Sequence, residues 1–397
     1  MRIVQVTWSL LCADVSECLA SLGHDVVSVP QAGPGLTERL AHALRANQAD
    51  LLFSLNFNPH YAAVAHQTRR PYAAWNIDNV CSSAFCAPRF ALPHTHLFCI
   101  DRPSLDLYRR AGYPNLHYLP IGSNLARFQP PPDDDILNKE RAVSFVGCSM
   151  IRQGNEYPGF LAGLRRQRDA ITDPRTRQVC QATLDAIEAI VEAECRDYFR
   201  SSLSERLAEA SRRLGFDLAS TLYHDPPFFG MLLGKEISSR KRLDLIRRLG
   251  EKLPVNLFGD DDWRILAGGL IRYRGKADYR ADTPTAYRQS AINLNIEKVY
   301  NTSSINIRIV DAMACGGFVL TEAVEDLPRF FEAGRDLETF SSLPELLDKA
   351  AYYLDHEHER EAIARSGCQK VRATFSLAGR LKDLLAAIPI PPRAGPL

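Results

Sequence analysis

The sequence lacks an excess of charge of either sign. Its 397 residues include 48 lysines and arginines against 47 aspartates and glutamates, which leaves a formal net charge of +1. Proteins that bind nucleic acids or anionic membrane surfaces usually carry an excess of positive charge, and the overall balance here does not supply one. We therefore expect no nucleic-acid partner.

Long hydrophobic runs are also missing. No stretch approaches the roughly 20 apolar residues that cross a bilayer. The N-terminus begins as a strand, without a basic leader followed by an apolar segment and a small-residue cleavage site. These absences predict a cytoplasmic protein without a transmembrane segment.

The sequence has no cysteine or carboxylate pattern typical of a metal site. Its ten cysteines are scattered, and Cys99 and Cys148 lie within or beside apolar runs, where a thiol behaves as a small hydrophobe. Cys81 and Cys86 lack a second pair at the spacing of zinc ligands. The aspartates at 260–262 are consecutive, so they point in different directions and indicate a solvated turn. We expect reduced thiols and no bound metal.

The first 125 residues alternate short apolar runs with helix-like stretches, separated by glycine, proline or asparagine. Strands that alternate with helices at this spacing predict a mostly parallel sheet with helices on both faces. We expect a Rossmann-like domain over residues 1–125. The expected strands are 2–8, 24–29, 50–55, 72–77, 96–100 and 116–119.

The second half repeats this organisation with one interruption. Residues 126–139 are rich in proline and aspartate, which is typical of a linker between domains. A second Rossmann-like domain is expected over 140–376, interrupted by a strand-free helical insertion at about 159–250. Residues 377–397 are expected to form a last helix and a tail. The predicted fold class is therefore α/β, with two Rossmann-like domains that face each other across a cleft.

Residues 290–321 have the pattern of a βαβ unit. We expect a strand at 291–296, a helix at 304–314 and a second strand at 318–321. The hydroxyls of Thr302, Ser303 and Ser304 would then lie at the helix start, where free backbone amides favour an anion such as phosphate. The alternative is that Ser303 or Ser304 is simply an N-cap.

Ligands of open α/β sheets bind beyond the carboxyl ends of the strands, which selects candidate residues in both domains. Arg152 and Arg308 are the candidate cations for a phosphate group. The alternatives are that Arg152 is an ordinary surface residue and that Arg308 pairs with Asp311 one helical turn away. The candidates on the second domain are Gly147, Ser149, Arg152, Glu297, Thr302, Ser303, Ser304, Asn306, Arg308 and Asp311.

Two residues of the first domain are candidates for a general base. Asp78 and His60 both follow expected strands, so both would lie at the edge of the sheet where a ligand binds. The alternatives are that Asp78 caps the segment that follows it and that His60 is an ordinary loop histidine beside Pro59.

Several motifs carry a family resemblance. They are the sequence NLHYLPIG at 115–122, FVG at 145–147, NLN at 293–295, the pattern Asn306-x-Arg308-x-x-Asp311 followed by AMACG, and YAAWNIDN at 72–79. With these motifs the chain resembles glycosyltransferases of the GT-B fold. Within that fold it is most similar to the CgeB-like, spore-maturation type group, and also to group 1 or family 4 transferases.

The resemblance implies a nucleotide-sugar donor bound mainly by the second domain and an acceptor held mainly by the first. It also implies that no metal or other cofactor is needed. Relatives hold the donor ribose with a glutamate at the position of Asp311, and family 4 relatives carry another glutamate at the position of Ser303. Both positions differ here.

Three functions stay open on the sequence alone. The first is a glycosyltransferase that acts on a glycan, a protein or a small molecule. The second is a nucleotide-sugar 2-epimerase, since these isomerases share the fold. The third is a non-catalytic module that binds a sugar nucleotide or a protein, with the helical insertion as a protein contact.

Overall fold

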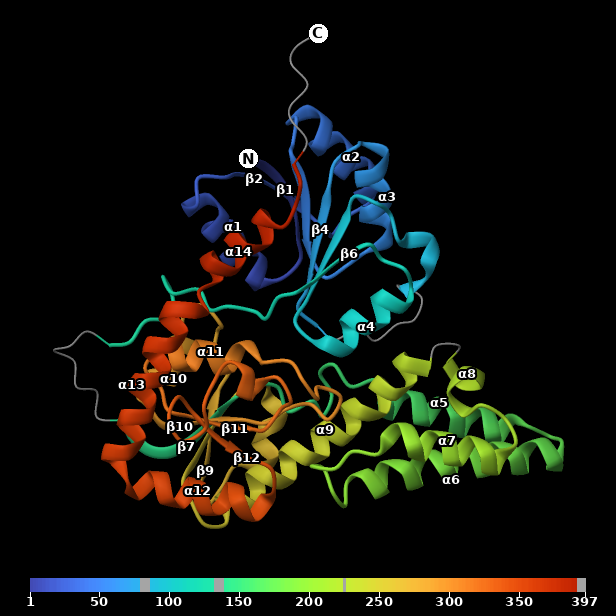
Figure 1. Ribbon diagram of the computed structural model, residues 1–397. Helices are drawn as coiled ribbons and strands as arrows, with labels where there is room; N and C mark the ends of the chain where they lie inside the picture. Colours follow the sequence, from blue (N-terminus) through green and yellow to red (C-terminus); the bar gives the residue numbers. More distant parts are fainter. Residues whose placement is uncertain (79–85, 132–138, 224–225, 391–397) are drawn as a thin grey trace, which may run out of the picture.

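The structure is a computed structural model of the chain, and it describes residues 1–78, 86–131, 139–223 and 226–390. Two parallel six-stranded sheets form the centres of two layered bodies, one above the other in Figure 1. Helices cover both faces of each sheet, as parallel sheets require. The predicted α/β class with two Rossmann-like halves is confirmed.

The first sheet has the strand order β2-β1-β3-β4-β5-β6, with every neighbouring pair parallel. All six of its strands begin and end within one residue of the expected limits. The strands are β1 (Arg2–Thr7), β2 (Asp25–Pro30), β3 (Leu51–Leu55), β4 (Tyr72–Asn76), β5 (Thr95–Cys99) and β6 (Asn115–Tyr118). The helices around it are α1 (Leu10–Ser21), α2 (Leu36–Ala46), α3 (Pro59–Gln67) and α4 (Arg102–Arg110).

The second sheet has the order β12-β11-β10-β7-β8-β9 and is also parallel throughout. Its strands are β7 (Glu140–Val146), β8 (Val255–Phe258), β9 (Ile271–Gly275), β10 (Ser290–Asn295), β11 (Val319–Glu322) and β12 (Glu338–Phe340). The short edge strand β12 was not expected from the sequence. The helices around this sheet are α10 (Thr283–Gln289), α11 (Ile307–Ala314), α12 (Leu343–Asp355) and α13 (Glu357–Thr374).

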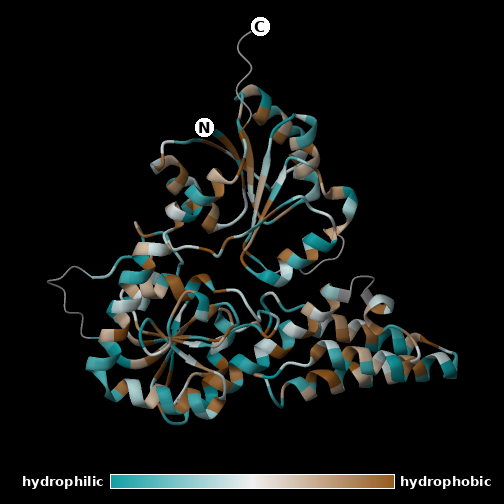
Figure 2. Ribbon diagram, in the orientation of Figure 1, coloured by the Kyte–Doolittle hydropathy of each residue, from teal (hydrophilic) through white to brown (hydrophobic). Residues whose placement is uncertain are grey.

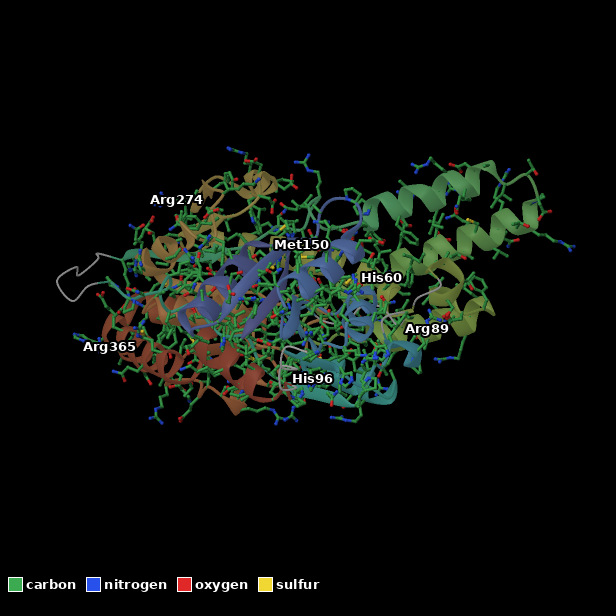
Figure 3. The ribbon with its side chains drawn as sticks, turned by 90° about the horizontal axis from the view of Figure 1, so that it is seen from above. His60, Arg89, His96, Met150, Arg274 and Arg365 are labelled. Atoms are coloured by element: carbon green, nitrogen blue, oxygen red, sulfur yellow. The ribbon has the colours of Figure 1, made fainter. Side chains whose placement is uncertain are left out.

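The helical insertion lies between β7 and β8 and contains more helix than expected. It consists of α5 (Tyr157–Ala170), α6 (Pro174–Glu194), α7 (Leu203–Leu214), α8 (Leu218–Tyr223) and α9 (Pro226–Gly250). Helix α9 begins with Pro226 and Pro227, because proline is well accommodated in the first turn of a helix, where its missing N–H has no intrahelical partner. Figures 1 and 3 both show α5 to α7 extending to one side of the second sheet.

The cores of the two bodies are separate. Figure 2 shows hydrophobic residues along the strands and hydrophilic residues on the outer turns of the surrounding helices. The insertion has a core of its own, which includes Ile187, Leu218, Phe229 and Leu233. Residues 1–125 and 140–376 remain our proposed domain limits, and the proposed linker lies partly outside the described residues.

The last helix, α14 (Leu377–Ala386), returns to the first body. Its side chains Leu377, Leu381 and Leu384 pack with Val15 and Leu19 of α1 in one apolar cluster. Figure 1 shows α14 beside α1, away from the second sheet. The chain therefore crosses between the two bodies twice.

The expected helix at 304–314 begins three residues later than predicted. Helix α11 starts at Ile307, and the side chain of Asn306 caps it by accepting a hydrogen bond from the backbone N–H of Arg308. The run 302–304 therefore lies in the preceding loop rather than at the helix start. Asp311, on the helix itself, is buried.

Within the described part of the chain, no helix is long and apolar enough to cross a membrane. The nine cysteines for which the structure gives a position are free thiols. This agrees with the expected reduced state of these nine, while Cys81 lies outside the described residues.

Candidate functional site

A cavity of about 330 Å³ lies between the carboxyl ends of the two sheets. The first body contributes mostly apolar side chains to it, and the second contributes mostly polar ones. This is the place where open α/β sheets bind ligands, and here it opens between two such sheets. The lining residues are Leu11, Ile77, Asp78, Ile100 and Ile121 on one side, and Glu297, Lys298, Asn301, Ser304, Ile305, Asn306, Ile307 and Arg308 on the other.

The loop after β10 is held in shape by Asn301. Its amide nitrogen donates to the carboxylate of Glu297 at 2.7 Å and to the carbonyl of Ser304 at 3.1 Å. Its amide oxygen accepts from the backbone N–H of Ser304 at 3.1 Å. Glu297 also accepts from the side chain of Asn295, so this buried carboxylate is occupied by amides rather than by a cation. These bonds keep Ser304 out of the helix and bring the loop to the cavity wall.

Arg308 extends from the first turn of α11 toward the end of β10. Its guanidinium donates to the side-chain oxygen of Asn295 at 3.2 Å and to the carbonyl of Ile296 at 3.4 Å. The same group lies 5.7 Å from the centre of the Phe145 ring. The expected alternative, an ion pair with Asp311, is absent among the described residues, because Asp311 has other partners.

A second guanidinium lies directly behind the first. Arg242 of helix α9 is 1% exposed, and it donates to the carbonyl of Cys148 at 2.7 Å and to that of Ile296 at 3.5 Å. Its guanidinium is also 5.7 Å from the Phe145 ring, and its Nε has no hydrogen-bond partner. Burial lowers the pKa of Arg242 to about 10, and the charge of Arg308 contributes to the decrease.

Lys298 brings a third cation to the cavity. Its ammonium lies 5.5 Å from the centre of the Tyr300 ring. Burial lowers the pKa of Lys298, the charges of Arg242 and Arg308 add to this decrease, and the charge of Asp78 opposes it. Among the described residues, none of these three cations forms an ion pair with a carboxylate.

The charges of Arg242 and Arg308 lower the pKa of Lys298, and the charge of Arg308 lowers the pKa of Arg242, so the three cations repel one another. The charges of Glu297 and Asp78 offset part of this repulsion. An anion bound in the cavity would relieve it. The site therefore has the charge of a receptor for a phosphate-bearing ligand.

Asp78 lies on the opposite wall of the cavity, just after β4. It is exposed, and its carboxylate accepts a hydrogen bond from the side chain of Asn56 at 2.8 Å. Asn56 follows β3 with a φ of 61°, and its oxygen accepts from the backbone of Ile77 at 2.9 Å. The expected helix-capping alternative concerns residues outside the described part of the chain. Asp78 thus faces the cavity with one fixed hydrogen-bond donor.

His60 does not line this cavity. It is an exposed residue in the first turn of α3, labelled in Figure 3, and its backbone N–H donates to the side chain of Asn58. Its role as a base remains untested.

The loop after β7 is arranged differently from expectation. The backbone N–H and the hydroxyl of Ser149 both donate to Asp260 at 2.6 Å, which leaves the hydroxyl bonded away from the cavity. The side chain of Arg152 is 80% exposed and pairs with Asp262. Gly147 is the member of this loop that touches the site, since a β-carbon there would lie 2.7 Å from the Arg308 guanidinium.

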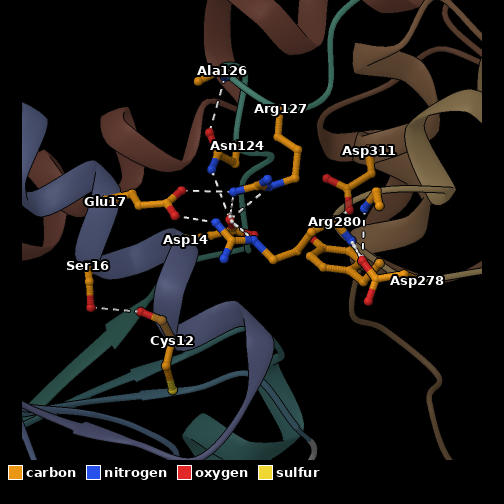
Figure 4. Close-up of polar contacts among 12 residues, drawn as sticks. Cys12, Asp14, Ser16, Glu17, Asn124, Ala126, Arg127, Asp278, Arg280 and Asp311 are labelled. Carbon is orange, nitrogen blue, oxygen red and sulfur yellow. Dashed lines mark hydrogen bonds and ion pairs between the residues drawn. The ribbon is translucent and has the colours of Figure 1, made fainter.

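Asp311 is buried away from the cavity at the contact between the two bodies (Figure 4). Its two carboxylate oxygens accept from the hydroxyls of Ser123 at 2.6 Å and Tyr279 at 3.0 Å. Burial raises the pKa of Asp311 to about 8, and the charge of Asp14 adds to the increase. Each oxygen already accepts a hydrogen bond from a protein hydroxyl, so a contact with ribose would require these hydrogen bonds to rearrange.

The same contact contains a cluster of opposite charges. Asp14 and Glu17 of α1 pair with Arg127, which donates to Asp14 at 2.8 Å. Arg280 of the second body pairs with Glu17 (Figure 4). This cluster holds the two bodies together beside Asp311.

Thr302 and Ser303 also lie outside the interdomain cavity. Thr302 is exposed, and the hydroxyl of the buried Ser303 has no hydrogen-bond partner in the described structure. Three residues of the site were not predicted. Lys298 and Asn301 follow β10, where the rule on strand ends selects residues, whereas Arg242 lies in a helix whose sequence gives no such signal.

The described residues contain no group of three or more histidine, cysteine, aspartate or glutamate side chains that could hold a metal ion.

Part of the sequence resembles a known protein family. Residues 240–386 match the family described as "Glycosyl transferase-like". No curated protein sequence matches the chain.

Solved structures of similar fold cover nearly the whole chain. Anabaena Alr3699/HepE in complex with UDP-glucose has 12% identity and a TM-score of 0.57, over 97% of this chain and 98% of that one. A glycosyltransferase from Rickettsia africae has 11% identity and a TM-score of 0.57, over 99% of each chain. Sucrose-phosphate synthase from Thermosynechococcus elongatus has 14% identity and a TM-score of 0.50, over 97% and 98%. The chain therefore has the fold of the GT-B glycosyltransferases, and its residues 240–386 match the glycosyl transferase-like family.

Proposed function

We propose that the protein is a glycosyltransferase that moves a sugar from a nucleoside-diphosphate sugar to an acceptor hydroxyl. The observation that carries this proposal is the group of three cations at the interdomain cavity: Arg308 and Lys298 line it, Arg242 lies behind Arg308, and none of them forms an ion pair in the described part of the chain. A diphosphate is the anion whose charge matches such a group. The fold and the family match support the same reading.

In the proposed reaction the bond between the anomeric carbon and the diphosphate oxygen breaks as the acceptor oxygen bonds to that carbon. Negative charge develops on the leaving diphosphate, where Arg308 and Lys298 stabilise it directly and Arg242 adds to the positive potential from behind. Fixed side-chain cations supply this stabilisation without a metal ion.

Asp78 is our choice for the general base if the reaction inverts the anomeric configuration. Its carboxylate faces the cavity from the first body, and Asn56 holds it in place at 2.8 Å. The carboxylate would take the proton of the acceptor hydroxyl as the new bond forms. A retaining reaction needs no such base.

We propose a uridine nucleotide as the donor, because the similar Anabaena protein was solved with UDP-glucose. The CgeB-like subtype and a cytoplasmic location are parts of the same proposal. Asp311 stays a predicted ribose contact.

The test is a thermal-shift series with UDP, UDP-glucose, and GDP-, dTDP- and CMP-sugars. A ligand that binds only the native state at 100 times its Kd stabilises that state by about 2.7 kcal/mol. We expect UDP and UDP-glucose to raise the melting temperature. If no nucleotide shifts it in well-folded protein, the donor site is refuted. Release of an isomerised sugar nucleotide without any acceptor would instead indicate a 2-epimerase.

Gly147→Ala is expected to weaken UDP binding without unfolding the protein. The new β-carbon would lie 2.7 Å from the Arg308 guanidinium and 3.1 Å from the Phe145 ring, so the flexible arginine would move. We expect a Kd increase of about tenfold, equal to about 1.4 kcal/mol, measured by calorimetric titration. Gly159→Ala is the control, because a β-carbon there meets nothing within 4 Å. Equal Kd values for both variants would show that displacing the Arg308 guanidinium from its place beside Gly147 does not affect UDP binding.

A further inference from the structure

A second and larger cavity, of about 640 Å³, lies between the helical insertion and the loop after β10. Helix α7 contributes Leu203, Leu207 and Ala208, and helix α9 contributes Met231. The loop contributes Val299, Tyr300 and Thr302. This volume is within the usual range of small-molecule sites, roughly 300–1,000 Å³.

One loop separates this cavity from the interdomain cavity. Glu297, Lys298 and Asn301 line the interdomain side, while the intervening Val299, Tyr300 and Thr302 line the insertion side. Neighbouring residues of the same loop thus line the two cavities.

The wall formed by this loop is fixed in place. The backbone N–H of Val299 donates to the hydroxyl of Ser238 on α9 at 3.0 Å. Tyr300 packs against Gly234 of the same helix, where an added β-carbon would lie 2.8 Å from its ring. The ammonium of Lys298, which lines the interdomain cavity, lies 5.5 Å from the centre of the same Tyr300 ring. A molecule in the second cavity would therefore lie next to the cations proposed to hold the donor.

The chemistry of the lining is unlike that of the interdomain cavity. Leucine, methionine, valine and alanine side chains alternate with the hydroxyls of Ser204, Ser211 and Thr302. The described lining contains no lysine, arginine or histidine. Its carboxylate, Asp217, is engaged in capping α8, where it accepts from the backbone N–H of Ser220 at 2.6 Å. Such a surface favours a ligand without net charge that has an apolar body and hydroxyl groups.

We propose that this cavity holds the apolar body of the acceptor, an uncharged small molecule whose free hydroxyl extends past the loop at 299–302 into the interdomain cavity that Asp78 lines. The inference rests on the proposed glycosyltransferase function, since only that function requires an acceptor beside the donor. The family resemblance implied an acceptor held mainly by the first domain, whereas this proposal assigns its apolar part to the helical insertion. The insertion is then a substrate-binding element.

The test uses n-octyl β-D-glucoside below its micelle concentration as an uncharged amphiphilic probe and octyl sulfate as its anionic comparator. Binding to the full chain is measured by saturation-transfer difference NMR and titration. Ala208→Trp places a large side chain at the cavity and is expected to weaken octyl glucoside binding at least tenfold. Arg212→Trp is the matched control, because this exposed residue lies on the same helix but outside the lining.

Supporting results are loss of octyl glucoside binding in Ala208→Trp, its retention in Arg212→Trp, and binding that persists with saturating UDP. Displacement of the probe by UDP, an unchanged affinity in Ala208→Trp, or equal binding of octyl sulfate would overturn the proposal. Failure of the donor proposal has a different signature: no nucleotide raises the melting temperature, while octyl glucoside binding still depends on Ala208. That result would leave a ligand cavity but remove its role as an acceptor site.

Discussion

Replacing Arg308 by alanine is expected to raise the Kd for UDP about 100-fold while the melting temperature of the unliganded protein stays near that of the wild type. Hydrogen bonds to charged groups contribute about 1.5–3 kcal/mol, and an arginine that faces a diphosphate makes at least one. Two such contributions at the lower end correspond to a 100-fold change. Among the described residues the guanidinium of Arg308 donates hydrogen bonds to Asn295 and Ile296, neither of them charged, and its removal also relieves repulsion with Arg242.

Two further variants make this result specific. Arg308→Lys keeps the charge but loses the fork of donors, and we expect an intermediate affinity. Arg152→Ala is the matched control, since Arg152 is a cation on the same side of the second sheet but is exposed and paired with Asp262. If Arg152→Ala weakens UDP binding as much as Arg308→Ala, the loop after β7 moves on binding and the assignment of the cations must be revised. Calorimetric titration with UDP measures all three.

Asp311→Asn is expected to stabilise the protein at pH 8 and to change little at pH 4. Burial raises the pKa of Asp311 to about 8, compared with 3.8 for the unperturbed group. Asparagine has the same shape and no charge, so its side chain can still bond to Ser123 and Tyr279. Because one pKa unit corresponds to about 1.4 kcal/mol, we expect a gain of about 2 kcal/mol or more in the free energy of unfolding at pH 8.

The pH dependence follows from linkage. Below pH 4 the carboxyl is protonated in both the folded and the unfolded state, so it contributes no pH dependence. Between pH 4 and 8 the unfolded chain has released the proton while the folded protein keeps it, so the free energy of unfolding falls as pH rises. Above pH 8 both states are ionised and the decrease stops.

Urea unfolding of wild type and Asp311→Asn at pH 5, 6.5 and 8 isolates this group, because all other groups titrate alike in both proteins. Asp106→Asn, which removes an exposed carboxylate of α4, is the control and should run parallel to the wild type. Parallel curves for Asp311→Asn would mean that Asp311 is ionised in the folded protein at neutral pH. The same variant reports on the ribose: lower UDP affinity together with higher stability would support that predicted contact.

The sequence was sufficient for the two sheets because their signals are local. Apolar strands bounded by turn residues and amphipathic helices recur along the chain, and strands such as Leu51–Leu55 and Asn115–Tyr118 lie within one residue of their predicted limits. β12 was missed because three residues carry too little pattern to separate a strand from a loop.

The site was harder to predict because its geometry depends on contacts between distant residues. The start of α11 depends on Asn301, whose side chain captures the backbone of Ser304 before the helix can include it. Ser149 had the expected position after a strand, but Asp260, far along the chain, takes both of its donors. Arg242 could not be found, because only the fold brings α9 to the Ile296 carbonyl.

The two places where the chain crosses between the bodies lie against each other, and this restricts how the protein can move. The backbone N–H of Ser123 donates to the carbonyl of Phe375 at 2.8 Å, and that of Leu377 donates to the carbonyl of Ser123 at 2.7 Å. A β-carbon at Gly122 would lie 2.7 Å from the Phe375 carbonyl, so the two segments touch without space between them. A rotation of the bodies about this place would keep both hydrogen bonds between the crossings, whereas sliding one body past the other would break them. Such a rotation would change the distance between the two walls of the interdomain cavity. Asp311 and Ser123 would lie near the axis, and Asp78 and Lys298 would lie on opposite walls.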